Sequence, residues 1–520
     1  MSPKPTVAAA LVDDTAAGAA AAGAAAAGAA AAGAAAAGGA LWQPPAGGFW
    51  EGAWKDGRRT LEVHDPETGR LVGVVMDATV EEVGRAVAHV AREHVRRGWP
   101  LWQRREVLER ATVRLAAEED RFTSLIVAEG CKTVTEARRE VRRAVETLRL
   151  SAAAAATLTG RTVPFDNTDR GEGWVGWHTR EPLGVVAAIT PFNDPLNLVA
   201  HKLGPALVTG NAVVLKPAEA TPLSALALVA LLLEGGVPGE YLAVVTGRDA
   251  GPALVAHPGV DVVSFTGGPA TADRIARSGP ARKLLMELGG NNAAIVCADA
   301  DPELVAGAIV DGAFGVAGQN CLSVQRVLVS SAVYERLVDL VVEKAAALVV
   351  GSKADPRTDV GPLIDQEAAI RVVRWIEEAV AAGARLHTGG RRSGAYVTPA
   401  VLTGVPLHTR LWQEEVFGPV MVLAPFTEVD EALELANGVD TGLQAGVFTR
   451  NLDVAMYAAA RLRVGAVLVN STSDFRIDAM PFGGFKRSGI GREGVSSAVE
   501  ALTEPKVVAI KTVMDLGAPA

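Results

Sequence analysis

The sequence predicts an α/β protein with two doubly wound parallel-sheet domains, a small β arm and a disordered N-terminal tail rich in Ala and Gly. The first observation is that short, continuously apolar runs alternate with helical segments over most of the chain. Strands of this kind are typical of parallel sheets that helices cover on both faces. The second is that the alternation begins again after Leu288. The third is the length of 520 residues, which is enough for two or three domains.

The first 40 residues are of low complexity, and from residue 16 they are almost entirely Ala and Gly, with a glycine at every fifth position from Gly18 to Gly38. Regular glycines oppose a helix, and no apolar stripe is present to dock one. The run lacks the basic start and Leu-rich centre of a signal peptide, and Ala and Gly are too weakly apolar for a membrane span. We therefore expect a solvated tail and no membrane partner.

The next region is expected to be helical after an initial strand pair. Residues 63–73 have the pattern of a strand, a turn and a strand. Thr79 with Glu82 is typical of a capping box, which predicts a helix through Val90. Further helices are expected at 103–119, 121–129 and 134–157. The following segment, 157–182, resembles a projecting strand pair, to which the strand at 507–510 returns.

Two strand and helix alternations follow. The first has strands at 185–189, 212–215, 242–245 and 262–265, and helices at 195–209 and 224–233. The second has strands at 293–297, 325–330, 444–449 and 466–470, and helices at 302–317, 332–349, 365–382, 428–437 and 451–462. The predicted boundaries are 1–40 for the tail, 41–156 with 180–288 for the first domain, 289–485 for the second, and 157–179 with 486–512 for the arm.

Charge and cysteine content narrow the classes of function. The net charge is −9 with a pI near 5.6, and the charges are interspersed. No basic patch suggests a nucleic-acid partner. The three cysteines, Cys131, Cys297 and Cys321, are odd in number and widely spaced. This pattern fits free thiols in a reducing cytoplasm better than a disulfide framework or a zinc site, so no metal is expected.

Three polar residues at the ends of core strands could carry covalent acyl chemistry. Cys321 follows the turn Gly318–Gln319–Asn320, Glu287 precedes Gly289–Gly290, and Asn193 follows an apolar strand and precedes a helix. A thiol, a carboxylate and an amide provide a nucleophile, a general base and an oxyanion donor. The alternative for Cys321 is a small buried hydrophobe, and spacing alone does not show that the three residues meet.

These stretches belong to a set of seven motifs that occur in order over residues 41–512 and together resemble the aldehyde dehydrogenase superfamily. The other four are Lys216–Pro217–Ala218–Glu219, Phe265–Thr266–Gly267–Gly268, Glu414–Glu415–Val416–Phe417–Gly418–Pro419 and Pro481–Phe482–Gly483–Gly484–Phe485–Lys486–Arg487–Ser488–Gly489. The resemblance implies that the first domain binds the dinucleotide and that the second carries the catalytic thiol. It also implies homodimers or homotetramers built through the arm, against the alternative of a hairpin within one subunit.

The resemblance also implies a cofactor site, although no Gly-x-Gly-x-x-Gly element follows a strand. Gly267 and Gly268 would lie beside the pyrophosphate, and Gly268 takes the place of a serine common in the family. Lys216 and Glu219 would meet the adenosine ribose. A carboxylate there accepts hydrogen bonds from a free 2′-hydroxyl, which favours NAD while leaving NADP possible. The remaining expected cofactor contacts are Ile189, Leu288, Glu415 and Phe417.

The expected reaction is oxidation of a small aldehyde to the carboxylic acid through a Cys321 thioester, which water activated by Glu287 hydrolyses. The alternatives are transfer of the acyl group to coenzyme A, whose enzymes characteristically lack this base, and a non-enzymatic relative. The resemblance places Arg149, His201 and Arg476 at the substrate, which suits an aldehyde with an anionic tail. The local motifs look most like phosphono-aldehyde dehydrogenases, and also like lactaldehyde or non-phosphorylating glyceraldehyde-3-phosphate dehydrogenases. The alternative is surface arginines and a structural histidine.

Overall fold

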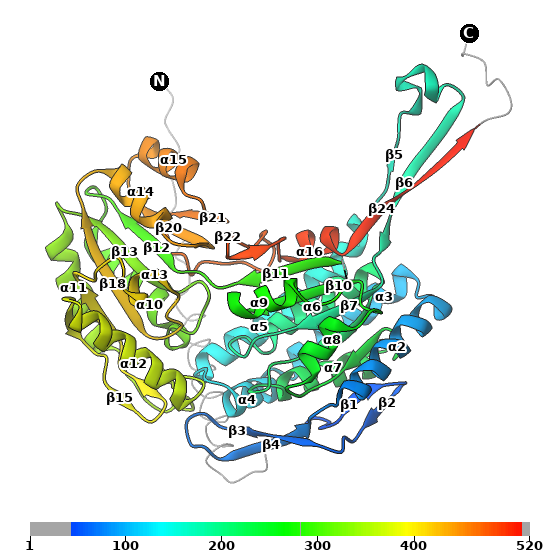
Figure 1. The fold of residues 1–520 in the computed structure, drawn as a ribbon, viewed down its shortest axis with the longest axis horizontal. Helices are drawn as coiled ribbons and strands as arrows, with labels where there is room; N and C mark the ends of the chain where they lie inside the picture. The colour runs from blue at the N-terminus through cyan, green and yellow to red at the C-terminus, as the bar shows by residue number, and fades with distance from the viewer. Residues whose placement is uncertain (1–42, 281, 512–520) are drawn as a thin grey trace, which may run out of the picture.

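The computed structural model describes residues 43–280 and 282–511, and the predicted tail lies outside this range. Two large sheets, each flanked by helices, lie on opposite sides of the molecule, and a narrow β arm projects from the body (Figure 1). The predicted fold class is therefore confirmed in its main features.

The first sheet has eight strands in the order β2-β1-β9-β8-β7-β10-β11-β23. Its five central strands, β9 to β11 in that order, are parallel, whereas β1, β2 and β23 pair antiparallel at the edges. The strands are β1 (Gly48–Trp50), β2 (Ala53–Lys55), β7 (Val185–Ile189), β8 (Ala212–Lys216), β9 (Leu242–Val244), β10 (Val262–Gly267), β11 (Lys283–Leu288) and β23 (Gly489–Ile490).

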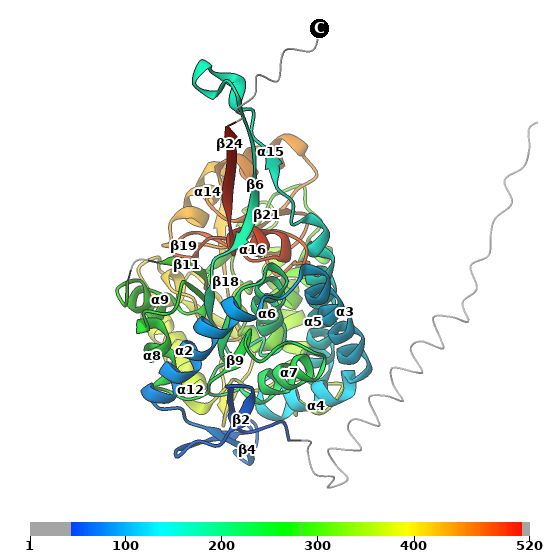
Figure 2. The ribbon, with the colours of Figure 1, turned by 90° about the vertical axis from the view of Figure 1, so that its right-hand side faces the viewer.

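Helices cover both faces of this sheet because its central strands are apolar on both sides. Ala188 and Val213 face one apolar cluster and Ala187 and Val214 the other. Figure 2 shows α2, α8 and α9 on one side and α3, α5, α6 and α7 on the other. The helices are α2 (Val80–Arg97), α3 (Leu101–Ala117), α4 (Glu119–Glu129), α5 (Val134–Ala153), α6 (Asn197–Thr209), α7 (Leu223–Glu234), α8 (Ala250–Ala256), α9 (Pro269–Ala276) and α16 (Val495–Ala501).

The second sheet has seven strands in the order β14-β17-β18-β13-β12-β20-β21, and only β14 pairs antiparallel. The strands are β12 (Asn292–Val296), β13 (Val324–Ser330), β14 (Arg385–Thr388), β17 (Ala400–Thr403), β18 (Val420–Phe426), β20 (Gln444–Phe448) and β21 (Ala466–Val469). The helices around it are α10 (Pro302–Phe314), α11 (Tyr334–Ala347), α12 (Gln366–Ala381), α13 (Arg410–Gln413), α14 (Val429–Asn437) and α15 (Leu452–Arg461).

The projecting arm is a three-stranded sheet in the order β24-β6-β5. Its strands are β5 (Arg161–Thr162), β6 (Trp174–Pro182) and β24 (Thr503–Lys511). The pairing of Thr503–Lys511 with Trp174–Pro182 confirms the predicted return of the C-terminal strand. Three two-stranded sheets complete the described residues: β3 (Thr60–His64) with β4 (Leu71–Met76), β15 (Arg392–Ser393) with β16 (Tyr396–Val397), and β19 (Thr441–Gly442) with β22 (Phe485–Lys486).

The predicted helix ends need two corrections. Thr79 and Glu82 form the predicted capping box of α2, but the helix predicted over 134–157 ends at Ala153 and passes into the 3₁₀ turn η1 (Ala154–Thr157). The helix predicted over 302–317 instead ends at Phe314 and is followed by a 3₁₀ turn, η4 (Gly315–Gly318), in which Val316 and Ala317 have left-handed φ angles of 51° and 52°. This turn redirects the chain toward Cys321. Among the described residues, no helix combines the length and the apolar composition that crossing a bilayer requires.

Candidate active site

A cavity of about 1660 Å³ lies where the carboxyl ends of β7, β8, β10 and β11 face the start of β13. Pockets for drug-sized ligands hold about 300 to 1,000 Å³, so this cavity can hold a dinucleotide together with a small substrate. Parallel strands bring their carboxyl ends to one edge of a sheet, which gathers residues far apart in sequence. The predicted site residues that line the cavity are Cys321, Glu287, Asn193, Ile189, Lys216, Glu219, Gly267, Gly268, Leu288, Glu415, Phe417 and Arg476.

Cys321 is held by the turn that precedes it. The Gln319 side chain donates to the carbonyl oxygens of Val316 (3.1 Å) and Pro362 (3.3 Å), and Asn292 Nδ2 donates to the Cys321 carbonyl oxygen (2.8 Å). A β-branched residue at positive φ is unusual, so Val316 marks backbone strain beside the thiol. The described part of the chain supplies no acceptor for the Cys321 backbone N–H, which leaves that donor free for a ligand.

The surroundings of Cys321 favour the thiol over the thiolate. Burial raises its pKa well above the usual range, and the Glu415 carboxylate adds to the increase, while Arg476 acts in the opposite direction. Among the described residues, Sγ makes one polar contact, a long one of 3.8 Å to Asn320 Oδ1. The thiol therefore needs a base, or a change of its surroundings on ligand binding, before it can attack a carbonyl carbon.

Glu287 has the properties of a general base. It lies near the end of β11, is 6% exposed, and its Oε2 atom is buried with no hydrogen-bond partner in the described residues. Burial raises its pKa well above 4.5, and Glu493 raises it further, although Lys202 partly offsets both. A carboxylate of raised pKa removes a proton from water more effectively than an ordinary one. Gly483 lies against it, since a Cβ there would be 3.0 Å from Glu287 Oε1.

Asn193 lies between β7 and α6, and its side-chain amide makes no hydrogen bond within the described residues. Its neighbours fix its backbone. Thr221 Oγ1 donates to the Phe192 carbonyl oxygen (3.3 Å), and Asp194 is held by ion pairs with Lys132 and Arg143. Cys321, Glu287 and Asn193 thus line one cavity. Their reactive groups make few hydrogen bonds within the described residues, so they are available to a ligand.

The predicted pyrophosphate site combines two glycines with the start of α9. A Cβ at Gly267 would come within 2.5 Å of the Phe265 ring, whereas a Cβ at Gly268 would meet no atom within 4 Å. The backbone at Gly268 is therefore approachable from the cavity, and the α9 N-terminus favours an anion there. Lys216, at the end of β8, forms an ion pair with Glu219. These features fit a dinucleotide.

Glu415 and Phe417 face the cavity from the second sheet. Burial raises the pKa of Glu415 to about 8, although a hydrogen bond from the Gly290 N–H (3.3 Å) lowers it. Gly289 leaves no room for a side chain, because a Cβ would lie 1.7 Å from Glu415 Oε2. Phe417 has a left-handed φ of 48° and packs edge-on against Phe192, with ring centroids 5.8 Å apart.

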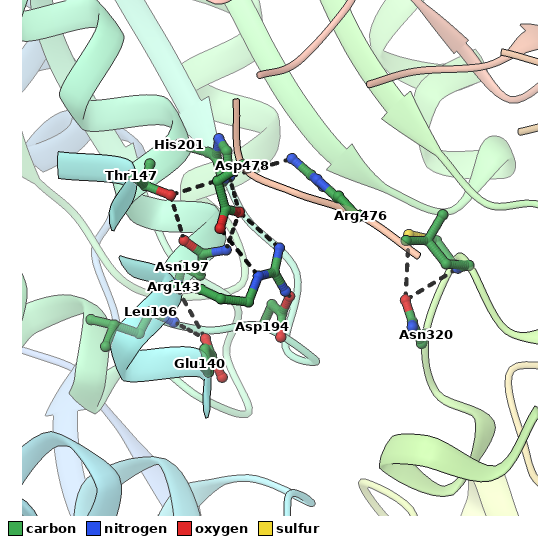
Figure 3. A network of polar contacts seen from close by, with 12 residues as sticks. Glu140, Arg143, Thr147, Asp194, Leu196, Asn197, His201, Asn320, Arg476 and Asp478 are labelled. Carbon is green, nitrogen blue, oxygen red and sulfur yellow. Dashed lines mark hydrogen bonds and ion pairs between the residues drawn. The ribbon is translucent and has the colours of Figure 1, made fainter. Parts of the chain in front are cut away.

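Two of the three predicted substrate residues do not line the cavity. Arg149 is on the outer face of α5, where its guanidinium binds Glu146 (2.6 Å) and is 57% exposed. It lies six positions after Arg143 on α5, a spacing that turns it to another face of the helix, so the structure does not bring it to the cavity. His201 is 2% exposed and lies behind the cavity wall, where Nε2 contacts Asp478 Oδ1 (2.9 Å) (Figure 3). The structure therefore does not bring His201 to the cavity either.

Arg476 does line the cavity, and its charge is shared with a neighbour. Its Nη2 donates to Glu493 Oε2 (2.7 Å) and its guanidinium stacks on the Phe482 ring at 3.9 Å. Its Nε is buried with no hydrogen-bond partner among the described residues. The sequence argument missed Arg143, which lines the cavity from α5 between Asp194 and Asp478 (Figure 3). The helical phase of α5, set by its buried Val141, Ala144 and Leu148, could have identified Arg143.

Comparison with known proteins agrees with this geometry. A sequence model of the aldehyde dehydrogenase family matches residues 54–508. Aspartate-semialdehyde dehydrogenase 1 of Pseudomonas canavaninivorans is 46% identical over 457 residues, covering 86% of this chain and 96% of that protein. The 3-sulfolactaldehyde dehydrogenase of Priestia aryabhattai is 41% identical over 461 residues, covering 88% and 96%. The crystal structure of an NADP-dependent glyceraldehyde-3-phosphate dehydrogenase from Bacillus halodurans, complexed with NADP, matches with a TM-score of 0.88 at 36% identity, covering 90% of this chain and all of that one.

Proposed function

The chain belongs to the aldehyde dehydrogenase family as an NAD(P)-dependent enzyme, and from this premise we propose that it oxidises a short, anionic aldehyde to the carboxylic acid. The observation that carries the proposal is the meeting of Cys321, Glu287 and Asn193 with two arginines, Arg143 and Arg476, in one cavity. Phosphono-aldehydes, predicted from the sequence motifs, are our specific candidates within this class.

The residues of the chain account for the chemistry as follows. The Cys321 thiol gives its proton to solvent water, Sγ bonds to the aldehyde carbon, and the C=O electron pair moves to the oxygen, which becomes an oxyanion. The Asn193 amide and the Cys321 N–H donate to this oxygen, and such donors are each worth about 3 to 4 kcal/mol in the transition state. The bound nicotinamide supplies the hydride acceptor. When hydride leaves the carbon, the carbonyl re-forms as a thioester on Sγ.

Glu287 completes the cycle. It takes a proton from water as the water oxygen attacks the thioester carbon, the C–S bond breaks, and the acid leaves with Cys321 restored as thiolate. Glu287 supports an acid product rather than transfer to coenzyme A, because water is a weak nucleophile that needs a general base, and enzymes that acylate coenzyme A characteristically lack this residue. Its buried, unpartnered Oε2 is suited to this role.

An anionic substrate is supported by the arginines. Arg143 uses three of its five N–H groups on Asp194 and Asp478, which leaves two for a ligand. Arg476 has its buried Nε unpartnered in the described residues. Guanidinium groups bind phosphonate, phosphate, sulfonate and carboxylate through paired hydrogen bonds. The relatives named above for aspartate semialdehyde, 3-sulfolactaldehyde and glyceraldehyde 3-phosphate all take aldehydes with an anionic group.

The test is a panel of short aldehydes bearing phosphonate, phosphate, sulfonate, carboxylate or no charge, each assayed with NAD and with NADP by absorbance of the reduced nicotinamide. We expect NAD to be preferred, because the Glu219 carboxylate repels a 2′-phosphate. Arg143→Gln and Arg476→Ala should each raise KM for the preferred anionic aldehyde about tenfold more than KM for propanal, the usual size of a lost charge-assisted hydrogen bond.

Arg149→Ala is the matched control, because this arginine is on the same helix as Arg143 but outside the cavity. It should change neither KM. If the two cavity variants affected propanal and the anionic aldehyde equally, the anionic substrate class would be wrong, whereas the aldehyde dehydrogenase activity itself would stand. Formation of an acyl-coenzyme A in place of the acid would contradict the proposed product.

We also propose that the chain forms a homodimer or homotetramer through its arm. Support comes from the apolar face of the arm, which carries Val175, Trp177 and Ile510 at 48, 41 and 47% exposure. Register places Ile510 opposite Val175, and Val508 opposite Trp177, so that these side chains share one face of the sheet. A contiguous apolar face on a projecting sheet is suited to cover by a second copy.

A further inference from the structure

Arg326 is a buried cation in the second sheet that makes no ion pair within the described residues. It lies on β13, five residues after Cys321, and is 1% exposed. Burial lowers its pKa to about 9. A charge this deep is retained only where other groups replace the lost water. The hydrogen-bond acceptors around the guanidinium therefore indicate the role of Arg326.

Backbone and amide oxygens surround the Arg326 guanidinium. Nη1 donates to the Leu435 carbonyl oxygen (2.7 Å) and Nη2 to that of Ala436 (3.1 Å), in the last turn of α14, where a cation is favourable. Nε donates to Asn291 Oδ1 (2.9 Å) and Nη2 to the Asn291 carbonyl oxygen (2.8 Å). Arg326 therefore ties β13 and α14 to the turn that follows Glu287 and Leu288.

The contact with Arg326 fixes the direction of the Asn291 amide. Because the amide oxygen faces the guanidinium, its nitrogen must point the other way. Asn291 Nδ2 donates to the carbonyl oxygens of Trp412 (2.6 Å) and Glu414 (3.3 Å). The Arg326 guanidinium thus orients Asn291 by binding both of its oxygens. Asn291 in turn holds the peptide segment directly before Glu415.

Gln325, next to Arg326 on β13, holds the same segment from the other side. Its Nε2 donates to the Glu414 carbonyl oxygen (2.8 Å) and its Oε1 accepts from the Val416 N–H (2.8 Å). Segment 412–416 is therefore held by buried side-chain hydrogen bonds rather than by a strand ladder. These bonds hold the backbone on both sides of Glu415.

We propose that Arg326 is a positioning residue for the cofactor: acting through Asn291, it holds segment 412–416 so that Glu415 and Phe417 face the nicotinamide end of the cavity. This inference rests on the proposed cofactor contacts of these two residues. Arg326 itself touches neither substrate nor cofactor, and lysine cannot replace it, because an ammonium group lacks the fork that engages both oxygens of Asn291.

The test measures cofactor binding and thiol reactivity separately on the purified full-length protein. NADH and NADPH are titrated by nucleotide fluorescence, and the cofactor-free Cys321 thiol is alkylated with iodoacetamide. Arg326→Lys should raise the dissociation constant of the reduced nucleotide about tenfold, a change expected for a displaced contact segment, while alkylation stays within about twofold. Asn291→Asp should do the same, because it keeps a partner for Arg326 yet loses the amide donor.

Two further variants separate the possible outcomes. Glu415→Gln tests the direct contact: if it leaves nucleotide affinity unchanged, the assigned cofactor role of Glu415 is wrong. If Glu415→Gln weakens binding while Arg326→Lys and Asn291→Asp do not, the positioning role is overturned. Equal changes in binding and alkylation would show a general structural role and would also overturn it. Arg336→Lys, in an exposed ion pair with Glu303 on the same domain, is the control and should change neither.

Discussion

At the residue scale, burial sets the chemistry of the two titrating groups. The same loss of water raises the pKa of Cys321 and that of Glu287. For the nucleophile this is unfavourable, because it keeps the thiol protonated. For the base it is favourable, because a more basic carboxylate accepts a proton from water more readily. The neighbouring charges, Arg476 near the thiol and Lys202 near the acid, partly offset the effect at both residues.

Glu287→Gln should convert the enzyme into one that stops at the thioester. General-base catalysis contributes about 10²- to 10⁴-fold, so we expect a burst of one reduced nicotinamide per site in stopped-flow absorbance, followed by turnover at least about 100-fold slower. In the wild type, deacylation needs the ionised carboxylate and should increase as pH rises through the elevated pKa of Glu287, above 4.5. The variant should lack this pH dependence, and retaining it would assign the base elsewhere.

At the scale of elements, turns rather than strands place the reactive groups. The 302–317 helix was predicted too long because Gly315, the C-cap at which it ends, was not read as a stop. A tertiary contact then holds the following turn, in which Glu136 Oε1 accepts a hydrogen bond from the Val316 N–H (2.6 Å). The apolar run of β18, Val420–Phe426, was missed as a strand although its composition is typical of one.

Gly289→Ala should disrupt the turn between β11 and β12. The added methyl group would lie 1.7 Å from Glu415 Oε2, so the buried carboxylate must move. We expect weaker binding of the reduced nucleotide by fluorescence titration and a fall in Tm of several degrees, corresponding to about 1 to 3 kcal/mol of overpacking. Gly307→Ala, on α10 with no atom within 4 Å of its Cβ, is the control and should not lower Tm. Unchanged Tm and affinity in Gly289→Ala would show that the Glu415 carboxylate can adopt another position without loss of stability or binding.

At the scale of the whole molecule, the arm and the cavity are built from segments far apart in the chain. β24 closes against β6 over nine residue pairs, from Thr503 opposite Pro182 to Lys511 opposite Trp174. The cavity takes residues from both large sheets. Folding of either sheet alone would therefore leave the site incomplete.

Charge on the apolar face of the arm should lower the oligomeric state. Trp177→Glu with Ile510→Glu places two carboxylates on the face that we propose a second copy covers, where an unpaired buried charge is strongly unfavourable. Light scattering after size-exclusion chromatography should report a smaller species than the wild type at equal concentration. Val507→Glu, on the opposite face of the same strand, is the control. A wild-type mass in the double variant would mean that subunits assemble elsewhere or not at all.

The sequence by itself determined the fold class, the family resemblance and most of the candidate site. Strand ends are local, so Cys321, Glu287 and Asn193 could be proposed from the apolar runs beside them, whereas the cofactor residues were proposed from the family resemblance. Only the tertiary structure decided which arginines of α5 line the cavity, Arg139 and Arg143, because that depends on how the helix is rotated in its packing. It also moved His201 behind the cavity wall and gave Arg326 its partners, since each of these contacts joins residues more than 30 positions apart.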